Sequence, residues 1–202
     1  LEVWDLAQDA LNGFSCFYTD MFSPRASLWL AKQAVTQGIP VVYNLQCTPS
    51  FMAGMGVEIK EIEQMLSLAT IVIGGRDSYR QLTVADDYTL ALPEMLAKYH
   101  NTDGLVCSLG SQGAAWLSHD GWVNLPAFSV EVVDSTGAGD CFAAGLIYDY
   151  FCCGKKDKTQ SMLFASAVAA LKCQVAGPRS KANFRQVLTL ITNKRDEIHN
   201  KN

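Results

Sequence analysis

The feature that most constrains the fold of this chain is the run Asp134-Ser-Thr-Gly-Ala-Gly-Asp140 and the apolar stretch that follows it. Residues 131–133 are typical of the end of a β-strand, and residues 138–151 are apolar at helical spacing. Gly137 and Gly139 allow backbone angles and close contacts that a Cβ atom would prevent. The run therefore predicts a tight connection from a strand into the N-terminus of a helix.

A helix N-terminus of this kind is suited to bind an anion. The backbone N–H groups of residues 137–140 would be unpaired donors, and the helix dipole favours negative charge beside them. Asp140 lies in the first turn. There it could accept a proton from an attacking hydroxyl while the donors neutralise a transferring phosphoryl group. The alternative, from the residues alone, is a tight turn in which Asp140 is only a cap.

The composition places the chain among globular proteins. Of its 202 residues, 49% are hydrophobic and 18% are charged, and no repeat or Pro/Gly-rich linker divides them, so we expect a single α/β domain over residues 1–202. The formal net charge is −4 with no basic stripe, which argues against a nucleic-acid partner. No apolar stretch reaches the length that a membrane span needs, so no membrane partner is expected.

The cysteines and histidines do not follow the patterns of transition-metal sites or of Ser-His-Asp and Cys-His catalytic centres. The seven cysteines are odd in number and scattered, which is typical of reduced thiols and predicts a cytoplasmic location. No Cys-x-x-Cys pair occurs, and the three histidines are isolated at positions 100, 119 and 199. A transition-metal site and a Ser-His-Asp or Cys-His catalytic centre are therefore not expected.

Strand-like runs alternate with amphipathic helical stretches, which predicts a largely parallel sheet with helices on both faces. The expected strands cover residues 14–18, 39–43, 70–73, 105–109, 114–118 and 122–125, and the last two form a hairpin. The expected helices cover residues 24–37, 58–68, 138–151, 158–173 and 183–194, and residues 93–99 are the clearest part of another helix. Ser23 is expected to cap the first helix. The polar residues 193–202 are expected to fray.

A second loop that could bind a ligand follows the strand predicted for residues 105–109. The segment Cys-Ser108-Leu-Gly110-Ser111-Gln-Gly113 places two glycines and two hydroxyl groups there. Open α/β sheets bind ligands at the carboxyl ends of their strands. Taken alone, a plain β-turn explains the segment about as well.

Together these segments resemble the ribokinase family of carbohydrate kinases, the phosphofructokinase-B type. Residues 134–140 are similar to the C-terminal signature of that family, and residues 108–113 are similar to its Thr-x-Gly-x-x-Gly nucleotide loop, with Ser108 in the threonine place. Residues 164–171 and Gly177 resemble the helix and loop that close over the adenine, with Ser166 where many members carry Asn. The resemblance extends from about Phe14 to the C-terminal helix.

The resemblance implies phosphoryl transfer from ATP, with Mg²⁺, to a hydroxyl of a sugar or related carbohydrate. Asp140 would be the general base. The implied anion-hole residues are Gly137, Ala138 and Gly139, and the implied nucleotide-binding residues are Ser108, Gly110, Ser111, Gly113, Ser166 and Gly177. Asp134 and Thr136 match positions that in many members help to bind a monovalent cation such as K⁺. A sugar-like small molecule is the expected partner, and a homodimer is left open.

Three departures from the family pattern bear on function. The Asn-x-x-Glu pair that arranges magnesium in relatives is replaced by Gly75 and Ser78, with Asp77 as a substitute one residue away. Residues 44–49 replace an Asp-x-Asn-x-Arg-Pro segment. Relatives also begin with about another hundred residues, which supply a first strand, a lid and a Gly-Gly substrate loop. We therefore expect the N-terminal part and lid to be absent here. The chain is expected to be the C-terminal part of a longer protein, and the alternative is a degenerate relative that has lost the substrate half.

The alternatives to a carbohydrate kinase fall into different classes. The lost magnesium pair favours a non-catalytic nucleotide-binding relative, and a nucleoside kinase of the same fold fits the same motifs. A dinucleotide-dependent oxidoreductase is disfavoured, because no Gly-x-Gly-x-x-Gly opens an early βαβ unit. The residues do not name the sugar.

Overall fold

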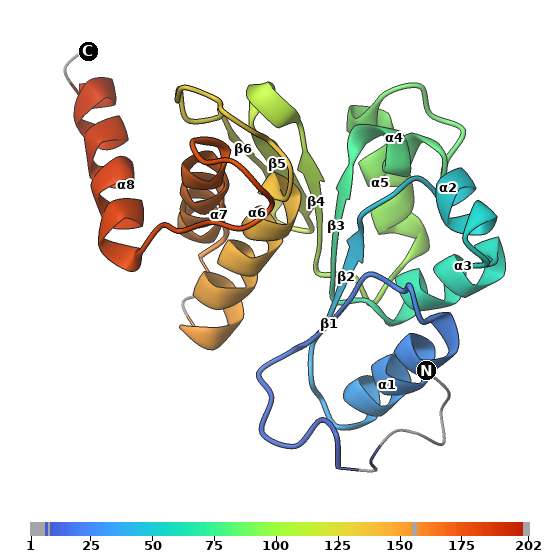
Figure 1. The fold of residues 1–202 in the computed structure, drawn as a ribbon. Coiled ribbons are helices and arrows are strands. Elements are labelled where there is room, and N and C mark those ends of the chain that lie inside the picture. The colour runs from blue at the N-terminus through green and yellow to red at the C-terminus, as the bar shows by residue number, and fades with distance from the viewer. Residues whose placement is uncertain (1–6, 8, 155–156, 200–202) are drawn as a thin grey trace. The chain divides into compact units, whose positions relative to one another are not determined.

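A computed structural model of the protein describes residue 7, residues 9–154 and residues 157–199, and strands and helices alternate along this part of the chain (Figure 1). The strands are β1 (Phe17–Thr19), β2 (Val41–Leu45), β3 (Ile71–Gly75), β4 (Gly104–Ser108), β5 (Ala114–Ser118) and β6 (Gly121–Leu125). Within the described residues they form one sheet in the order β1-β2-β3-β4-β5-β6, in which β1 to β4 pair in parallel. The prediction of an α/β fold with a largely parallel sheet is therefore confirmed.

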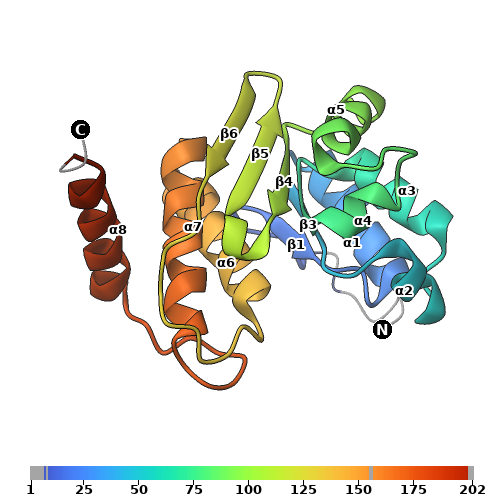
Figure 2. The same ribbon diagram turned by 90° about the horizontal axis from the view of Figure 1, so that it is seen from above.

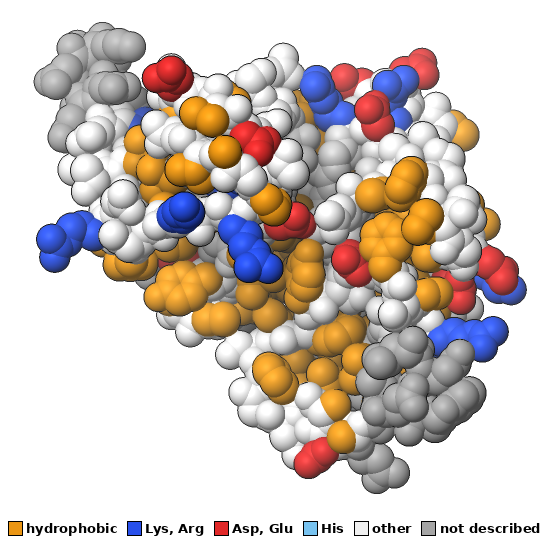
Figure 3. Space-filling model, viewed as in Figure 1, with side chains coloured by type: hydrophobic (Ala, Val, Ile, Leu, Met, Phe, Trp, Pro, Cys, Tyr) orange, Lys and Arg blue, Asp and Glu red, His pale blue; other side chains and the backbone are white. Residues whose placement is uncertain are grey.

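The chain divides into two compact units. The first consists of residues 1–108 and 115–122, and the second of residues 109–114 and 123–202. No helix among the described residues combines the length and the apolar character that crossing a membrane requires. On the face shown in Figure 3, basic and acidic side chains are interspersed outside the grey atoms.

The first unit packs helices against the buried strands of the sheet. Its helices are α1 (Pro24–Thr36), α2 (Pro49–Gly54), α3 (Ile59–Leu68), α4 (Arg76–Arg80) and α5 (Tyr88–Lys98). In Figure 2 they lie on one side of β1 to β4. Every residue of β2 is buried, as are the first four of β3 and of β4, which is expected of parallel strands covered by other elements.

Three details of the helices in the first unit differ from the sequence-based predictions or add to them. Ser23 precedes α1 but makes no side-chain capping hydrogen bond. The helix whose clearest part was predicted at residues 93–99 is present as α5 and begins at Tyr88, because the Asp87 carboxylate accepts the N–H of Thr89 and so caps it. Pro93 consequently lies inside α5, whose buried face compensates for the backbone hydrogen bond that proline cannot make. The short helices α2 and α4 were not expected.

The second unit is mainly helical. Its described residues form a 3₁₀ turn, η2 (Gly110–Gln112), the helices α6 (Ala138–Ile147), α7 (Lys158–Cys173) and α8 (Phe184–His199), and a π-helical turn, η3 (Tyr148–Cys152). In both Figure 1 and Figure 2, α6 and α7 lie side by side. A Cβ atom on Gly145 would lie 2.9 Å from the Cα of Ala165, so this glycine allows the two helices to approach closely.

Two expectations for the second unit are wrong. Residues 131–133 do not end a strand, because residues 126–133 contain none; instead the N–H groups of Val133 and Asp134 both donate to the carbonyl oxygen of Cys173 at the end of α7. The C-terminal stretch does not fray before its end, because α8 continues to His199. Residues 200–202, the last of those predicted to fray, lie outside the described residues. The prediction of one domain over residues 1–202 stays a prediction.

Candidate functional site

The predicted helix N-terminus is present in the second unit. Gly137 is the N-cap residue of α6, and its backbone is left-handed with φ 78°. A Cβ atom there would overlap the carbonyl oxygen of Pro178, so both the angle and the space require glycine. Gly139 differs, because no protein atom lies within 4 Å of the position that its Cβ would occupy. The surface at Gly139 is thus open to a ligand.

Not every predicted donor at this terminus is available. The N–H of Ala138 donates to the carbonyl oxygen of Ser135 over 3.0 Å and is engaged in the turn itself. Gly137 and Gly139 remain as candidate anion donors. Asp140 lies in the first turn of α6 and is exposed, so its carboxylate is accessible to a reacting hydroxyl.

Asp134 joins this turn to the loop that follows α7. One carboxylate oxygen accepts the N–H of Thr136 over 2.9 Å, and the other accepts the N–H of Gly177 over 2.8 Å. These hydrogen bonds, from Thr136 first and Gly177 second, lower the pKa of Asp134 to about 2, because they stabilise the charged form. Asp134 is therefore an ionised link between two loops far apart in the sequence.

Lys172 completes the same cluster. Its side chain is fully buried, and its Nζ atom donates to the carbonyl oxygens of Asp134 over 2.6 Å and of Val175 over 3.2 Å. Sequence reasoning missed this residue. The available signal was a lysine directly after the mostly apolar residues 162–171 of a long helix, since lysine is almost never fully buried unless it is paired.

The predicted nucleotide loop is divided between the two units. Gly110 (φ 59°) and Gly113 (φ 107°) adopt left-handed angles in the second unit, and a Cβ on Gly113 would overlap the carbonyl oxygen of Leu125. Both glycines therefore shape the loop, while Ser111 is exposed on it. Ser108 ends β4 in the first unit, and its Oγ atom donates to the carbonyl oxygen of Gly74 over 3.3 Å.

The two remaining predicted nucleotide residues lie in different surroundings. Ser166 is in the middle of α7 and is buried, at 9% exposure. Gly177 lies in the loop after α7 with φ 85°, and a Cβ atom there would meet no protein atom within 4 Å. The described hydrogen bonds thus gather Asp134, Thr136, Lys172 and Gly177 into one cluster.

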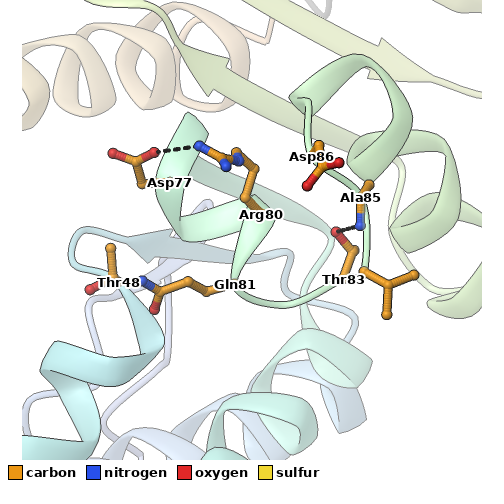
Figure 4. A pocket seen from close by; sticks show the side chains of 8 residues that line it. Thr48, Asp77, Arg80, Gln81, Thr83, Ala85 and Asp86 are labelled. Carbon is orange, nitrogen blue, oxygen red and sulfur yellow. Dashed lines mark hydrogen bonds and ion pairs between the residues drawn. The ribbon is translucent and has the colours of Figure 1, made fainter.

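The first unit has a pocket of its own at the carboxyl ends of β2 and β3 (Figure 4). Its volume is about 430 Å³, and its lining is Thr48, Asp77, Arg80, Gln81, Thr83, Val84, Ala85 and Asp86. Asp77, the predicted substitute for the lost magnesium pair, pairs there with Arg80 over 3.5 Å. Gly75 ends β3, while Ser78 is buried at 4% exposure and is not part of the lining. Of the three positions, Asp77 alone offers a carboxylate to a ligand.

Metal binding by protein side chains alone has little support. Among the described residues, no group of three or more His, Cys, Asp or Glu side chains could hold a metal ion. Magnesium commonly takes only one or two carboxylates and completes its shell with phosphate oxygens and water. The exposed carboxylate of Asp77 fits that limited role, which needs a nucleotide to complete the site.

Comparison with known proteins identifies a family and a fold. The family model described as pfkB family carbohydrate kinase matches residues 24–184. The 1-phosphofructokinase of Vibrio cholerae serotype O1 is 31% identical over 98 residues, which are 48% of this chain and 30% of that relative.

Solved structures extend the similarity over nearly the whole chain. One is aminoimidazole riboside kinase from Salmonella enterica, complexed with aminoimidazole riboside and an ATP analog. The alignment with it covers 95% of this chain and 66% of the kinase chain, with 23% identity and a TM-score of 0.75. Another is a fructokinase double mutant from Vibrio cholerae O395 in its fructose, ADP and potassium ion bound form. The alignment with it covers 92% of this chain and 64% of the fructokinase chain, with 18% identity and a TM-score of 0.77. The chain therefore spans less than two thirds of the length of these relatives.

Proposed function

Because the chain belongs to the pfkB family of carbohydrate kinases, we propose that it forms the nucleotide-binding part of an ATP-dependent kinase acting on a hydroxyl of a sugar or related carbohydrate. One observation carries the proposal most directly. The N-terminus of α6 is open at Gly139 and carries the exposed carboxylate of Asp140 in its first turn. An anion-binding terminus with an adjacent base suits phosphoryl transfer, in which catalysis consists of positioning and charge stabilisation.

The residues take separate roles in this proposal. The N–H groups of Gly137 and Gly139 would donate to the phosphoryl oxygens, where negative charge develops in the transition state. Asp140 would accept the proton of the attacking hydroxyl. The loop of Gly110, Ser111 and Gly113 would hold the nucleotide, because its left-handed glycines and exposed hydroxyl give a phosphate or ribose close access to the backbone.

Magnesium and the sugar are supported less directly by this chain. Asp77 is the residue that would help to hold Mg²⁺, which would neutralise negative charge on the phosphates. A sugar acceptor is supported by the relatives: one is a 1-phosphofructokinase, one was solved with aminoimidazole riboside and one with fructose. We propose a carbohydrate acceptor on that basis without naming a particular sugar.

The base role of Asp140 can be tested by one substitution. In a protein that joins this chain to the sugar-binding part of the fold, Asp140→Asn should lower sugar-dependent ATP turnover by about 10²- to 10⁴-fold, because general-base catalysis is lost. Its affinity for ATP, measured by calorimetric titration, should stay nearly unchanged. Glu131→Gln is the matched control, since Glu131 is an exposed carboxylate in the same connecting segment and should affect neither quantity.

The outcomes separate the competing functions. Near-parental turnover by Asp140→Asn would end the assignment of Asp140 as the base. If the protein that includes the sugar-binding part binds ATP but turns over with no sugar or nucleoside, the non-catalytic alternative is favoured. If the parent protein does not bind ATP, the proposed function is wrong.

A further inference from the structure

The ammonium group of Lys172 is buried, and burying a charged group is costly unless it is paired and hydrogen-bonded. Lys172 is fully buried, and Nζ lies 2.6 Å from the carbonyl oxygen of Asp134 and 3.2 Å from that of Val175. Two carbonyl oxygens from different loops converge on one cation. The lysine therefore joins the connection that leads into α6 to the loop that leaves α7.

A carboxylate lies in the same cluster and contributes negative charge. The two carboxylate oxygens of Asp134 accept hydrogen bonds from the N–H groups of Thr136 and Gly177. The cluster is thus one cation facing one carboxylate and two carbonyl dipoles, which is the kind of oxygen-rich site in which proteins also bind monovalent cations.

The residues present do not fit a bound K⁺ beside Asp134. A potassium ion needs a shell of oxygen atoms that can replace its water. The carbonyl oxygen of Asp134 is engaged by Lys172, and its two carboxylate oxygens are engaged by the N–H groups of Thr136 and Gly177. The carbonyl oxygen of Val175 is engaged by Lys172 as well. A positive charge already sits among these oxygens and would repel a second one.

We propose that the Lys172 ammonium serves as a built-in cation in place of the K⁺ expected beside Asp134, and that it positions the turn before α6. Lys172 is a positioning residue in this proposal, since it acts through Asp134 and the backbone. A bound ion stabilises a fold according to its concentration, whereas a tethered ammonium does so at any salt composition. The order of this turn should therefore be independent of K⁺. The effect on the turn stands without the proposed function; only the effect on ATP binding rests on it.

The primary test is the dependence of thermal stability on the monovalent cation. The midpoint of unfolding, Tm, is measured at equal ionic strength in potassium chloride, ammonium chloride and tetramethylammonium chloride. The parent protein should have the same Tm in all three salts. Lys172→Ala should lower Tm by several degrees in tetramethylammonium, because two carbonyl oxygens and a carboxylate lose their cation. Potassium or ammonium should recover most of that loss by entering the vacated space.

Two further variants separate the role of the charge from that of packing. Lys172→Met fills the space without a charge and should show no recovery by any cation. Lys194→Ala is the matched control, since Nζ of Lys194 also donates to two carbonyl oxygens in the second unit, those of Pro126 and Ala127. Its Tm should be equally affected in all three salts.

Each result either supports or overturns the proposal. Stabilisation of the parent by K⁺ relative to tetramethylammonium, shared by Lys194→Ala, would show that a potassium site persists and would overturn it. Equal loss of stability by Lys172→Ala in all three salts would reduce Lys172 to a structural residue and would also overturn it. If Lys172→Ala does not fold in any salt, the salt dependence of the parent decides alone.

A second experiment measures the affinity for ATP in the same three salts. The parent should bind ATP equally in all of them, and Lys172→Ala should bind more tightly in K⁺ than in tetramethylammonium. An absence of ATP binding by the parent in every salt would contradict the proposed function and would leave the Tm test of the lysine intact.

Discussion

At the scale of single residues, two glycines only two positions apart have different physical reasons to be glycine. Gly137 has a left-handed backbone, and a Cβ atom there would overlap the carbonyl oxygen of Pro178. Gly139 has open space around it, so the folded chain does not require a glycine there. The first glycine serves the fold, and the second leaves room beside the helix N-terminus for a ligand.

For Gly137, we expect Gly137→Ala to destabilise the fold. The left-handed angle costs a non-glycine residue roughly 1–2 kcal/mol, and the overlap with Pro178 adds to it. Urea unfolding should therefore show a lower midpoint for Gly137→Ala than for Gly139→Ala, which serves as the control. Equal midpoints for the two variants would contradict the assignment of Gly137 to the turn.

For Gly139, we expect Gly139→Val to weaken ATP binding at least tenfold with little change in Tm, because a branched side chain would block the open space at the helix N-terminus. Gly54→Val is the control, since Gly54 also has no protein atom within 4 Å of its Cβ position but ends α2 in the first unit. Calorimetric titration measures the affinity. Unchanged affinity in Gly139→Val would exclude phosphate binding at this terminus.

Asp134 predicts a defined pH dependence of stability. Its pKa falls from an ordinary 3.8 to about 2 on folding, so its contribution is present above about pH 4 and is lost as the pH falls towards 2. Compared with the parent, Asp134→Asn should be less stable at pH 6 and should lose less stability between pH 4 and pH 2. Asp103→Asn, at an exposed position of the first unit, should follow the parent. Parallel curves for Asp134→Asn and the parent would contradict the prediction.

At the scale of elements, the second unit depends on the contact between α6 and α7. Gly145 faces Ala165 and Val168 of α7, while its neighbour Ala144 is exposed on the same helix. The core beside α7 continues through a cluster of buried residues: Phe128, Phe164, Ala167, Ala170, Val187 and Ile191. A helix pair packed this closely leaves no room for an added side chain at the contact.

We therefore expect Gly145→Val to destabilise the second unit by about 1–3 kcal/mol, because the added methyl groups force the helices apart. Ala144→Val should cost only about 0.5 kcal/mol, from the lower helix propensity of valine. Far-ultraviolet circular dichroism during urea unfolding measures both. A cost for Gly145→Val no larger than that for Ala144→Val would show that the helices tolerate separation.

At the scale of the whole molecule, the open question is whether the two units unfold together, as the prediction of a single domain requires. Trp29, Trp116 and Trp122 belong to the first unit, and residues 109–114 and 123–202 contain no tryptophan. Tryptophan fluorescence therefore reports on the first unit alone.

Whether unfolding of the two units is coupled can be tested by comparing the tryptophan fluorescence of Gly145→Val and Ala144→Val during urea unfolding. If the chain is one cooperative domain, Gly145→Val in the second unit should shift the fluorescence midpoint of the first unit as far as it shifts the circular dichroism midpoint. A fluorescence midpoint equal to that of Ala144→Val, with a shifted dichroism midpoint, would show two independent domains.

The sequence by itself determined the elements whose signals are local. The Gly137 turn predicted the start of α6 at Ala138, and periodicity predicted α7 with its observed bounds, residues 158–173. The alternation of strands and helices predicted the parallel sheet. These features depend on backbone angles and on apolar spacing within a few residues, which a sequence displays directly.

Only the tertiary structure decided which distant groups meet. Lys172 reaches Asp134 across 38 positions, and no local pattern indicates that a buried lysine will find those carbonyl oxygens. Likewise Pro93 remains helical because α5 buries a face, and residues 126–133 become irregular because Val133 bonds to the end of α7. Such outcomes depend on the free energy of packing and pairing between segments distant in the sequence, which outweighs local preference when the two disagree.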